Sequence, residues 1–299
     1  MSDSADHRIY GIDEILESAN DGEMSFMEMI QKRQNSYAKG HKIVGYKTGF
    51  PVLDNLIGGL QKKHYTILAG YSGTGKTTFA LTMMRNLLKQ NIPLGFLSLE
   101  MTNSQVVEKL AIMESNICEK KLRDGNINVL EYQKLMEACE IMKTYPLYVD
   151  DRSGLAIELL GSKVAQMINY FQMKILFIDY IGEMTSIKKF NTSQELVATV
   201  SKGIRAVAKE YNIPILALCH LNRGSDIADR FPKKSDLRDS GQLEADATEI
   251  LMLYRHNRDN QKFNNNLMTC FIRKNRFGNE GKIEYHFNPK GLKIEEYKE

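Results

Sequence analysis

The sequence predicts an α/β fold built on a mainly parallel, twisted β-sheet, and three observations predict it. Short apolar segments alternate with helical ones from about residue 46 to residue 240. A glycine-rich loop joins the first of these strands to the first helix, and strand patterns alone follow residue 240. Alternation of this kind is typical of a parallel sheet with helices on both faces. The later strands predict antiparallel pairing at the C-terminal edge.

The elements follow in a regular order along the chain. Helices are expected at 76–90, 103–117, 128–142, 156–171 and 193–211. Strands of the alternating part are expected at 64–70, 94–99, 146–149, 174–179 and 213–219, and later strands at 247–254, 267–273, 282–287 and 291–295. Residues 1–45 read instead as two short amphipathic helices on a flexible link. We therefore expect a helical linker or interaction segment at 1–45 and the main domain at 46–299.

Composition excludes several classes of protein. The 299 residues, 42% of them hydrophobic, suffice for one large core. A net charge of +3 does not identify a nucleic-acid-binding protein, so any basic surface must be local. No apolar run approaches the roughly 18 residues that a membrane helix needs, so no membrane association is expected. Four scattered cysteines without a CxxC pair argue against zinc and disulfides, and favour a reducing, cytoplasmic setting.

The glycine-rich loop is the most specific signal in the chain. Residues 70–77 read GYSGTGKT and match the phosphate-binding pattern GxxxxGK[ST] between a strand and a helix. Backbone N–H groups and the helix N-terminus would hold the phosphates, Lys76 would reach the β- and γ-phosphates, and Thr77 would hold Mg²⁺. The alternative is a chance glycine loop, which the flanking strand and helix disfavour. The expected ATP-binding set is Gly70, Ser72, Gly73, Thr74, Gly75, Lys76, Thr77 and Thr78.

Two acidic residues end apolar strands and complete a candidate catalytic site. Asp179 follows the strand 175–178, where open α/β sheets bind ligands, and would orient Mg²⁺. Glu100 follows the strand 96–99. We expect that strand to lie beside the phosphate-loop strand, which would place Glu100 across the γ-phosphate from Lys76 as the general base. The alternatives are a turn cap for Asp179 and a helix cap for Glu100.

Several segments together resemble the DnaB family of replicative helicases, specifically its RecA-like motor domain. The segment 96–101 reads FLSLEM, and 178–180 reads IDY. Later segments in the family's order are LCHLNR at 218–223, SDLRDSGQLE at 235–244 and KNRFG at 274–278. The resemblance covers about residues 46–295. It implies a RecA-like P-loop ATPase that unwinds DNA as a ring, usually of six subunits, moving 5′ to 3′ along one strand.

The resemblance also implies roles for further residues. His220 would contact the γ-phosphate, although a buried structural histidine is the alternative. Arg276, with Lys274, would reach the nucleotide of the adjacent subunit, although a solvated or DNA-contacting basic turn is the alternative. The segment 222–241 would contact single-stranded DNA, unless it is an ordinary surface loop. Its expected DNA-contacting residues are Arg223, Arg230, Lys233, Lys234, Arg238, Asp239 and Gly241.

The sequence also departs from the family's pattern. His220 stands where bacterial members usually have glutamine, and Gly182 replaces another usual glutamine. From the length of residues 1–45 we do not expect the family's N-terminal collar domain, which binds primase, in this sequence, so a compact helicase and a motor fragment both stay open. A primase or a helicase loader is a further expected partner. Two other functions compete: a RecA-fold ATPase of recombinase or loader type that does not unwind DNA, and a nucleotide-binding ring scaffold with little hydrolysis.

Overall fold

The computed structural model describes residues 43–222, 230–237, 240–256 and 266–297, together with residues 27, 28, 30, 31 and 34. The chain divides into two compact units, Met1–Val44 and Gly45–Glu299. The expected N-terminal helices fall largely outside the described residues. None of the helices described there is both long enough and apolar enough to cross a bilayer.

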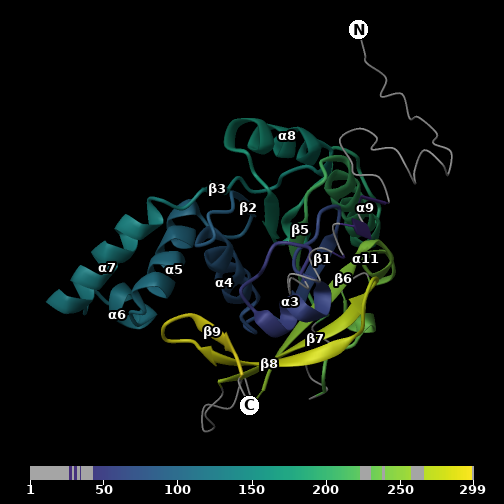
Figure 1. Cartoon of the computed structure of the whole chain (residues 1–299). Helices are drawn as coiled ribbons and strands as arrows, with labels where there is room; N and C mark the ends of the chain where they lie inside the picture. Colours follow the sequence, from purple (N-terminus) through teal and green to yellow (C-terminus); the bar gives the residue numbers. More distant parts are fainter. Residues whose placement is uncertain are drawn as a thin grey trace. The chain divides into compact units, whose positions relative to one another are not determined.

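A single mixed sheet organises this unit (Figure 1), and within the described residues it has nine strands in the order β3-β2-β4-β5-β1-β6-β7-β8-β9. Their bounds are β1 Tyr65–Gly70, β2 Leu94–Ser98, β3 Leu147–Asp150, β4 Ile175–Asp179, β5 Ile215–His220, β6 Glu249–Arg255, β7 Leu267–Asn275, β8 Gly281–Asn288 and β9 Lys293–Glu296. Strands β1 to β6 pair in parallel, and β7, β8 and β9 continue the sheet antiparallel from β6. The predicted mainly parallel sheet with an antiparallel C-terminal edge is confirmed.

Helices cover both faces of the sheet, as predicted. The longer ones are α4 Lys76–Leu88, α5 Asn103–Ser115, α7 Val129–Met142, α8 Leu160–Phe171 and α9 Ser193–Glu210. Buried side chains of α4 and α5 belong to one hydrophobic cluster, and those of α8 and α9 belong to another. Strand β1 contributes to both clusters because its side chains alternate: Leu68 packs in the first, and Ile67 and Ala69 pack in the second.

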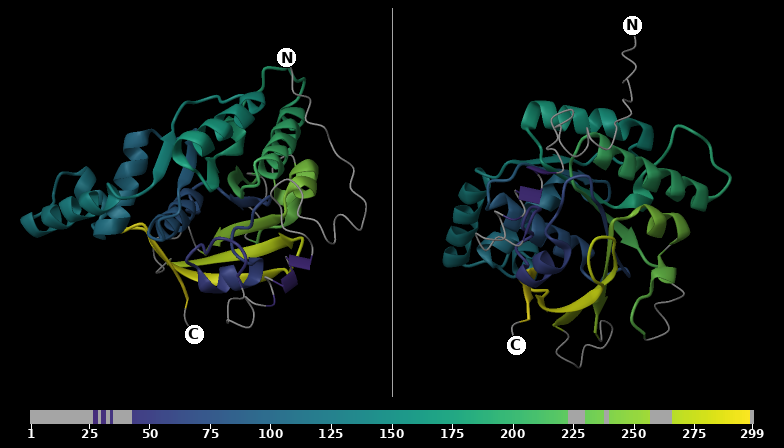
Figure 2. Two further views of the ribbon diagram at one scale, coloured as in Figure 1. Left: turned by 45° about the horizontal axis from the view of Figure 1, so that its top comes forward. Right: turned by 45° about the vertical axis from the view of Figure 1, so that its right-hand side comes forward.

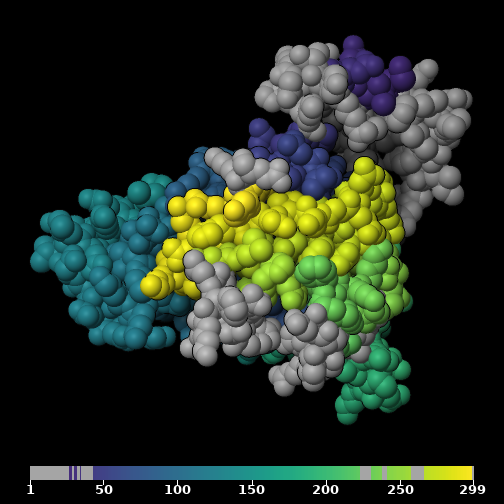
Figure 3. Space-filling view, turned by 90° about the horizontal axis from the view of Figure 1, so that it is seen from below, coloured from purple at the N-terminus to yellow at the C-terminus, as the bar shows by residue number. Residues whose placement is uncertain are grey.

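Several short elements escaped the sequence prediction. They are α3 Pro51–Ile57, α6 Glu119–Arg123, α11 Ser240–Asp246, and the 3-10 turns Ile181–Glu183 and Lys234–Asp236, whereas the 3-10 turn Ile157–Leu159 lies within the helix predicted at 156–171. Each is too short to show the periodicity by which longer helices are found. Helix α5 packs against α7. Together with α6, these helices extend to one side of the sheet, at the left of both views in Figure 2 and of the space-filling view from below (Figure 3).

One expectation about the order of strands is wrong. Strand β2 does not lie beside the phosphate-loop strand β1, because β4 and β5 lie between them. The neighbours of β1 are β5 and β6, both parallel to it. Strands that follow one another in sequence are often but not always neighbours, since a crossover helix can carry the chain past several strands. The arrangement places the end of β2 next to the end of β4.

Candidate nucleotide-binding site

The phosphate loop connects β1 to α4 through residues 71–75. Gly73 and Gly75 have φ angles of 74° and 96°, in the left-handed region that favours glycine. Thr74 closes the turn, because its backbone N–H and its hydroxyl both donate to the carbonyl of Tyr71, at 3.3 and 2.8 Å. Gly75 is the N-cap of the 13-residue helix α4. The loop therefore forms a backbone cradle at a helix N-terminus, the geometry that binds phosphate.

Lys76 is held within this cradle, and its side chain reaches a second strand end. It is only 6% exposed, and its Nζ donates to the carbonyls of Gly70 and Tyr71 at 3.0 Å each. Nζ also lies 3.2 Å from Nδ1 of His220. The pairing of β1 with β5 sets Gly70 opposite His220 in the register, which brings the two residues together. Both groups can therefore face the same phosphate.

Asp179 ends β4 beside the start of α4. Its side chain is 3% exposed, and its Oδ2 accepts a hydrogen bond of 2.8 Å from the hydroxyl of Thr77. Burial raises the pKa of Asp179 to about 6. The hydrogen bond from Thr77 opposes this rise, the negative charge of Glu100 adds to it, and the positive charge of Lys76 opposes it. A carboxylate that is destabilised by burial gains the most from a cation placed next to it.

Glu100 follows β2 and is exposed to solvent. Strand β2 pairs with β4, so Ser98 lies opposite Asp179, and the backbone N–H of Leu99 donates to the carbonyl of Asp179 at 2.8 Å. Glu100 therefore follows the strand that neighbours β4, close to Asp179. It does not follow a strand that neighbours the phosphate-loop strand β1. The cap of α5 is Thr102, whose hydroxyl accepts from the backbone of Gln105, so Glu100 is not the helix cap.

Tyr180 is a further residue of the site, and it was not predicted from the sequence to belong there. Its ring meets the ring of His220 edge to face, with centroids 4.5 Å apart. Its hydroxyl donates to Oε1 of Glu183 at 2.6 Å. A Cβ at Gly182 would lie 2.6 Å from Cε2 of Tyr180, so glycine leaves room for this ring. The two departures from the family's pattern, Gly182 and His220, are thus joined through Tyr180.

The residues at this site fit a magnesium–nucleotide complex. The cradle offers backbone N–H groups to phosphates, while Thr77 and Asp179 offer a hydroxyl and a buried carboxylate side by side. Within the described residues no cluster of three or more His, Cys, Asp or Glu could by itself hold a metal. Magnesium at nucleotide sites typically takes one or two protein oxygens and completes its shell with phosphate and water. The donor set here matches that pattern.

The basic turn after β7 lies at the opposite end of the sheet. The backbone N–H of Arg276 donates to the carbonyl of Thr248, just before β6 begins, whereas Gly70 of the phosphate loop pairs with Leu253, near the end of β6. The four residue-to-residue steps from Glu249 to Leu253 span about 13 Å of strand. The guanidinium of Arg276 lies near the carbonyl of Ala245, at 3.4 Å. Arg276 is therefore remote from the phosphate loop of its own chain.

Comparison with known proteins now identifies the family. The model of the DnaB-like helicase C-terminal domain matches residues 45–296. The chain belongs to this family. It is 33% identical to a probable replicative DNA helicase of Trieres chinensis over 85% of this chain and 58% of the relative. It is 29% identical to the replicative DNA helicase DnaC of Bacillus subtilis, over 92% of this chain and 66% of the relative.

Solved structures show the same fold. The ATPase domain of G40P matches with a TM-score of 0.84 at 24% identity, covering 91% of this chain and 98% of that domain. A DnaB-like replicative helicase, described with its interactions with primase, matches with a TM-score of 0.83 at 24% identity, over 90% of this chain and 66% of its own. The chain spans about half to two thirds of the length of the curated relatives it matches.

In this DnaB-like domain, the basic residues predicted to contact DNA have varied surroundings. Arg230 forms a two-pronged pair with the carboxylate of Asp236, at 2.7 Å for both contacts. Lys234 pairs with Glu280 at 2.9 Å and lies 3.7 Å from Glu244. The backbone N–H of Asn222, two residues after β5, donates to the carbonyl of Asp236 at 2.8 Å.

The remaining predicted DNA contacts divide between described and undescribed positions. Lys233 is exposed, and its backbone N–H donates to Asp236 at 2.7 Å. Gly241 lies in α11 with open space around its Cα. Arg223, Arg238 and Asp239 lie outside the described residues.

Proposed function

We propose that this chain is the ATP-hydrolysing motor of a ring-shaped, homo-oligomeric replicative DNA helicase, hexameric and moving 5′ to 3′ on single-stranded DNA. Its family membership and the names of its relatives support this proposal. So does a site that combines a phosphate cradle with a buried carboxylate–hydroxyl pair. We propose the cytoplasm as its location, since all four cysteines are free thiols.

Each residue of the site takes a distinct role in this proposal. Lys76 binds the β- and γ-phosphates, and Thr77 with Asp179 holds Mg²⁺, which neutralises phosphate charge when bound. Glu100, exposed beside Asp179, orients the attacking water and accepts its proton. His220 contacts the γ-phosphate from the end of β5. A change in nucleotide at His220 is in this way transmitted to the segment that follows β5, because the backbone N–H of Asn222 donates to the carbonyl of Asp236 in that segment.

The observation that carries the proposal is the separation of two half-sites on one sheet. The phosphate loop lies at the carboxyl end of the parallel strands, and Lys274 and Arg276 lie at their amino end. Arg276 forms no ion pair with a carboxylate among the described residues. Burial and the charge of Arg276 both lower the pKa of Lys274. Two half-sites on opposite ends of one chain complete each other when copies pack head to tail, and a ring closes that packing.

We propose the segment 222–241 as the single-strand contact, with Arg223, Arg238 and Asp239 among its members. Lys233 is the exposed basic residue of the described part of this segment. Arg230 is better suited to holding the segment in shape, because Asp236 already engages two of its nitrogens. Contact with the phosphate backbone, without reading bases, suits a motor that must track any sequence.

Residues 1–45 are proposed as a linker that contacts an adjacent copy, separate from the motor at 46–299. A solved neighbour is described with its interactions with primase. We propose primase or a helicase loader as a partner of the assembly on that ground.

The test combines ATP turnover with strand displacement on a forked DNA. The intact chain should hydrolyse ATP faster with single-stranded DNA and should unwind the fork. Glu100→Gln should bind ATP with unchanged affinity and lose turnover, because it keeps the shape of the side chain and removes the base. DNA-stimulated turnover without displacement would instead indicate a recombinase- or loader-type ATPase. Turnover at the original rate in Glu100→Gln would remove Glu100 from the catalytic role.

A further inference from the structure

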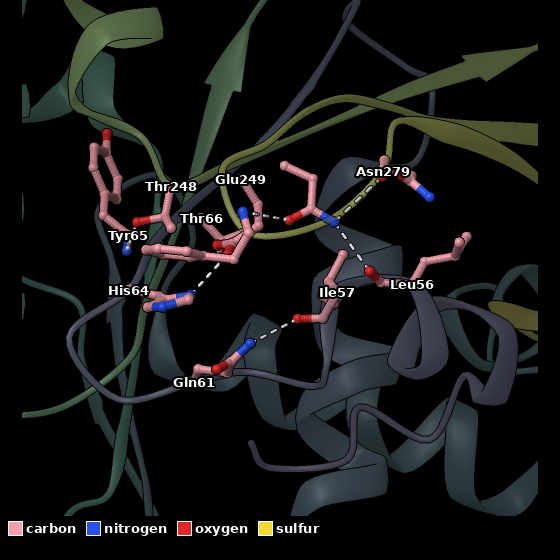
Figure 4. A network of polar contacts seen from close by, with 11 residues as sticks. Leu56, Ile57, Gln61, His64, Tyr65, Thr66, Thr248, Glu249 and Asn279 are labelled. Atoms are coloured by element: carbon pink, nitrogen blue, oxygen red, sulfur yellow. Dashed lines mark hydrogen bonds and ion pairs between the residues drawn. The ribbon is translucent and has the colours of Figure 1, made fainter. Parts of the chain in front are cut away.

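A polar network at the amino end of the parallel strands surrounds the basic turn, and none of the proposed roles uses it (Figure 4). At its centre is Glu249, the first residue of β6, which is only 2% exposed. Its Oε1 lies 2.7 Å from Nδ1 of His64, and its Oε2 accepts a bond of 2.8 Å from the hydroxyl of Thr66. An imidazole ring nitrogen and a carboxylate oxygen at this distance share a hydrogen bond, which ties His64 to Glu249. The pair therefore fixes the orientation of the imidazole ring.

The fixed imidazole ring supports the basic turn directly. Its outer face stacks on the ring of Phe277, with centroids 5.1 Å apart and planes tilted by 25°. Phe277 is 71% exposed, so little besides this stacking covers its ring. Phe277 follows Arg276 in the chain, so the stacking restrains the backbone from which the arginine extends.

Three further hydrogen bonds close the same turn. The side chain of Asn275 donates to the carbonyls of Leu56 and Asn279, at 3.0 and 3.3 Å. The backbone N–H of Arg276 donates to the carbonyl of Thr248 at 3.0 Å. These contacts hold the base of the turn, while the stacking on His64 holds its tip. Without the imidazole ring, the tip loses this stacking and keeps a bond of 3.4 Å from the backbone N–H of Phe277 to Oδ1 of Asn275.

We propose that His64, oriented by Glu249, is a positioning residue for Arg276. It sets the backbone of the turn so that the guanidinium reaches the nucleotide of an adjacent copy in a productive geometry. The inference rests on the proposed trans role of Arg276. Displacing a catalytic group by about 1 Å can cost up to about 100-fold in rate. The effect must appear in kcat, because the nucleotide binds to a different part of the sheet.

The experiment is a double-mutant cycle on ATP turnover by the full chain, assembled on single-stranded DNA. The four proteins are the unaltered chain, His64→Ala, Arg276→Ala and the double variant. We expect His64→Ala to lower kcat about tenfold and to leave KM within about twofold. Because His64 acts through Arg276, the double variant should turn over no more slowly than Arg276→Ala alone. A purely structural role for His64 would lower turnover in both backgrounds.

Phe277 provides a second route that does not disturb a buried carboxylate. Phe277→Ala should lower kcat in the same direction as His64→Ala, and Phe277→Tyr, which keeps the stacked ring, should restore it. Tyr170→Ala is the matched control, since Tyr170 is a similarly exposed aromatic residue, 79% exposed, on α8. It should leave turnover unchanged. This route holds even where His64→Ala unfolds the chain.

The outcomes separate this inference from the proposed function. If Arg276→Ala lowers kcat but His64→Ala and Phe277→Ala do not, the positioning role is refuted and the trans arginine stands. If the losses from His64→Ala and Arg276→Ala multiply in the double variant, the positioning role is likewise refuted. If Arg276→Ala itself turns over normally, the proposed trans site fails and this inference fails with it.

Discussion

Replacing Asp179 by asparagine should stabilise the metal-free protein while abolishing magnesium-dependent turnover. Burial raises the pKa of Asp179 from 3.8 to about 6 in the folded chain. The unfolded chain releases this proton at lower pH, so ionisation favours unfolding. The penalty is absent below pH 3.8, grows between pH 3.8 and pH 6, and is complete above pH 6. At about 1.4 kcal/mol per pH unit, the difference corresponds to roughly 3 kcal/mol.

Asparagine avoids this penalty and keeps the local geometry. Its side-chain oxygen can still accept the hydrogen bond from Thr77. We therefore expect the free energy of unfolding of Asp179→Asn to exceed that of the unaltered chain by about 2–3 kcal/mol at pH 7.5. A gain in stability with a loss of activity is the pattern expected where a charged group is kept for function.

The assay is denaturant unfolding with a chelator and without nucleotide, at several pH values from 4 to 7.5. The gap between the two proteins should close as the pH falls through 6 toward 4. Asp124→Asn is the matched control, because Asp124 is 48% exposed and its removal should give no comparable gap. Equal or lower stability of Asp179→Asn at pH 7.5, or a gap that does not change with pH, would refute the reasoning.

Two further substitutions test how α4 and α3 are anchored. Burial alone would raise the pKa of Glu114, but hydrogen bonds from Arg85, Lys89 and Tyr145 outweigh it and lower that pKa to about 2. Glu114→Gln should therefore reduce the free energy of unfolding by roughly 2 kcal/mol at pH 7, after allowance for solvent screening, and denaturant titrations should show the loss fading as the pH falls from 4.5 toward 2. The carboxylate of Glu296 accepts backbone bonds at the start of α3, at 3.0 to 3.1 Å. Glu296→Gln should lower the thermal midpoint by an amount equivalent to about 1 kcal/mol, and an unchanged midpoint would show that this cap does not contribute.

Much of the fold could be predicted because its signals are local. Apart from the edge strand β3, the parallel strands are short, mainly apolar runs that are largely buried. Every predicted long helix appears with its ends displaced by at most a few residues. The place of β2 could not be predicted, because strand order depends on where crossover helices carry the chain. The short helices α3, α6 and α11 were missed because five to seven residues do not show helical periodicity.

The candidate site likewise has one part that could be predicted from the sequence and another that could not. The phosphate loop is one contiguous motif, so its conformation could be predicted from the sequence. The contact between Lys76 and His220 depends on the pairing of β1 with β5, which no local pattern reveals. The network of His64 and Glu249 joins residues 185 positions apart, and its members follow no motif.

The central claim is that two half-sites on separate copies of this chain form one ATPase site on DNA. The most direct measurement is ATP turnover across protein concentration, with and without single-stranded DNA, with mass followed by light scattering. We predict that turnover per chain rises as rings assemble and rises again with DNA. A single chain that hydrolyses ATP at a constant rate, whatever its concentration and with or without DNA, would contradict the account.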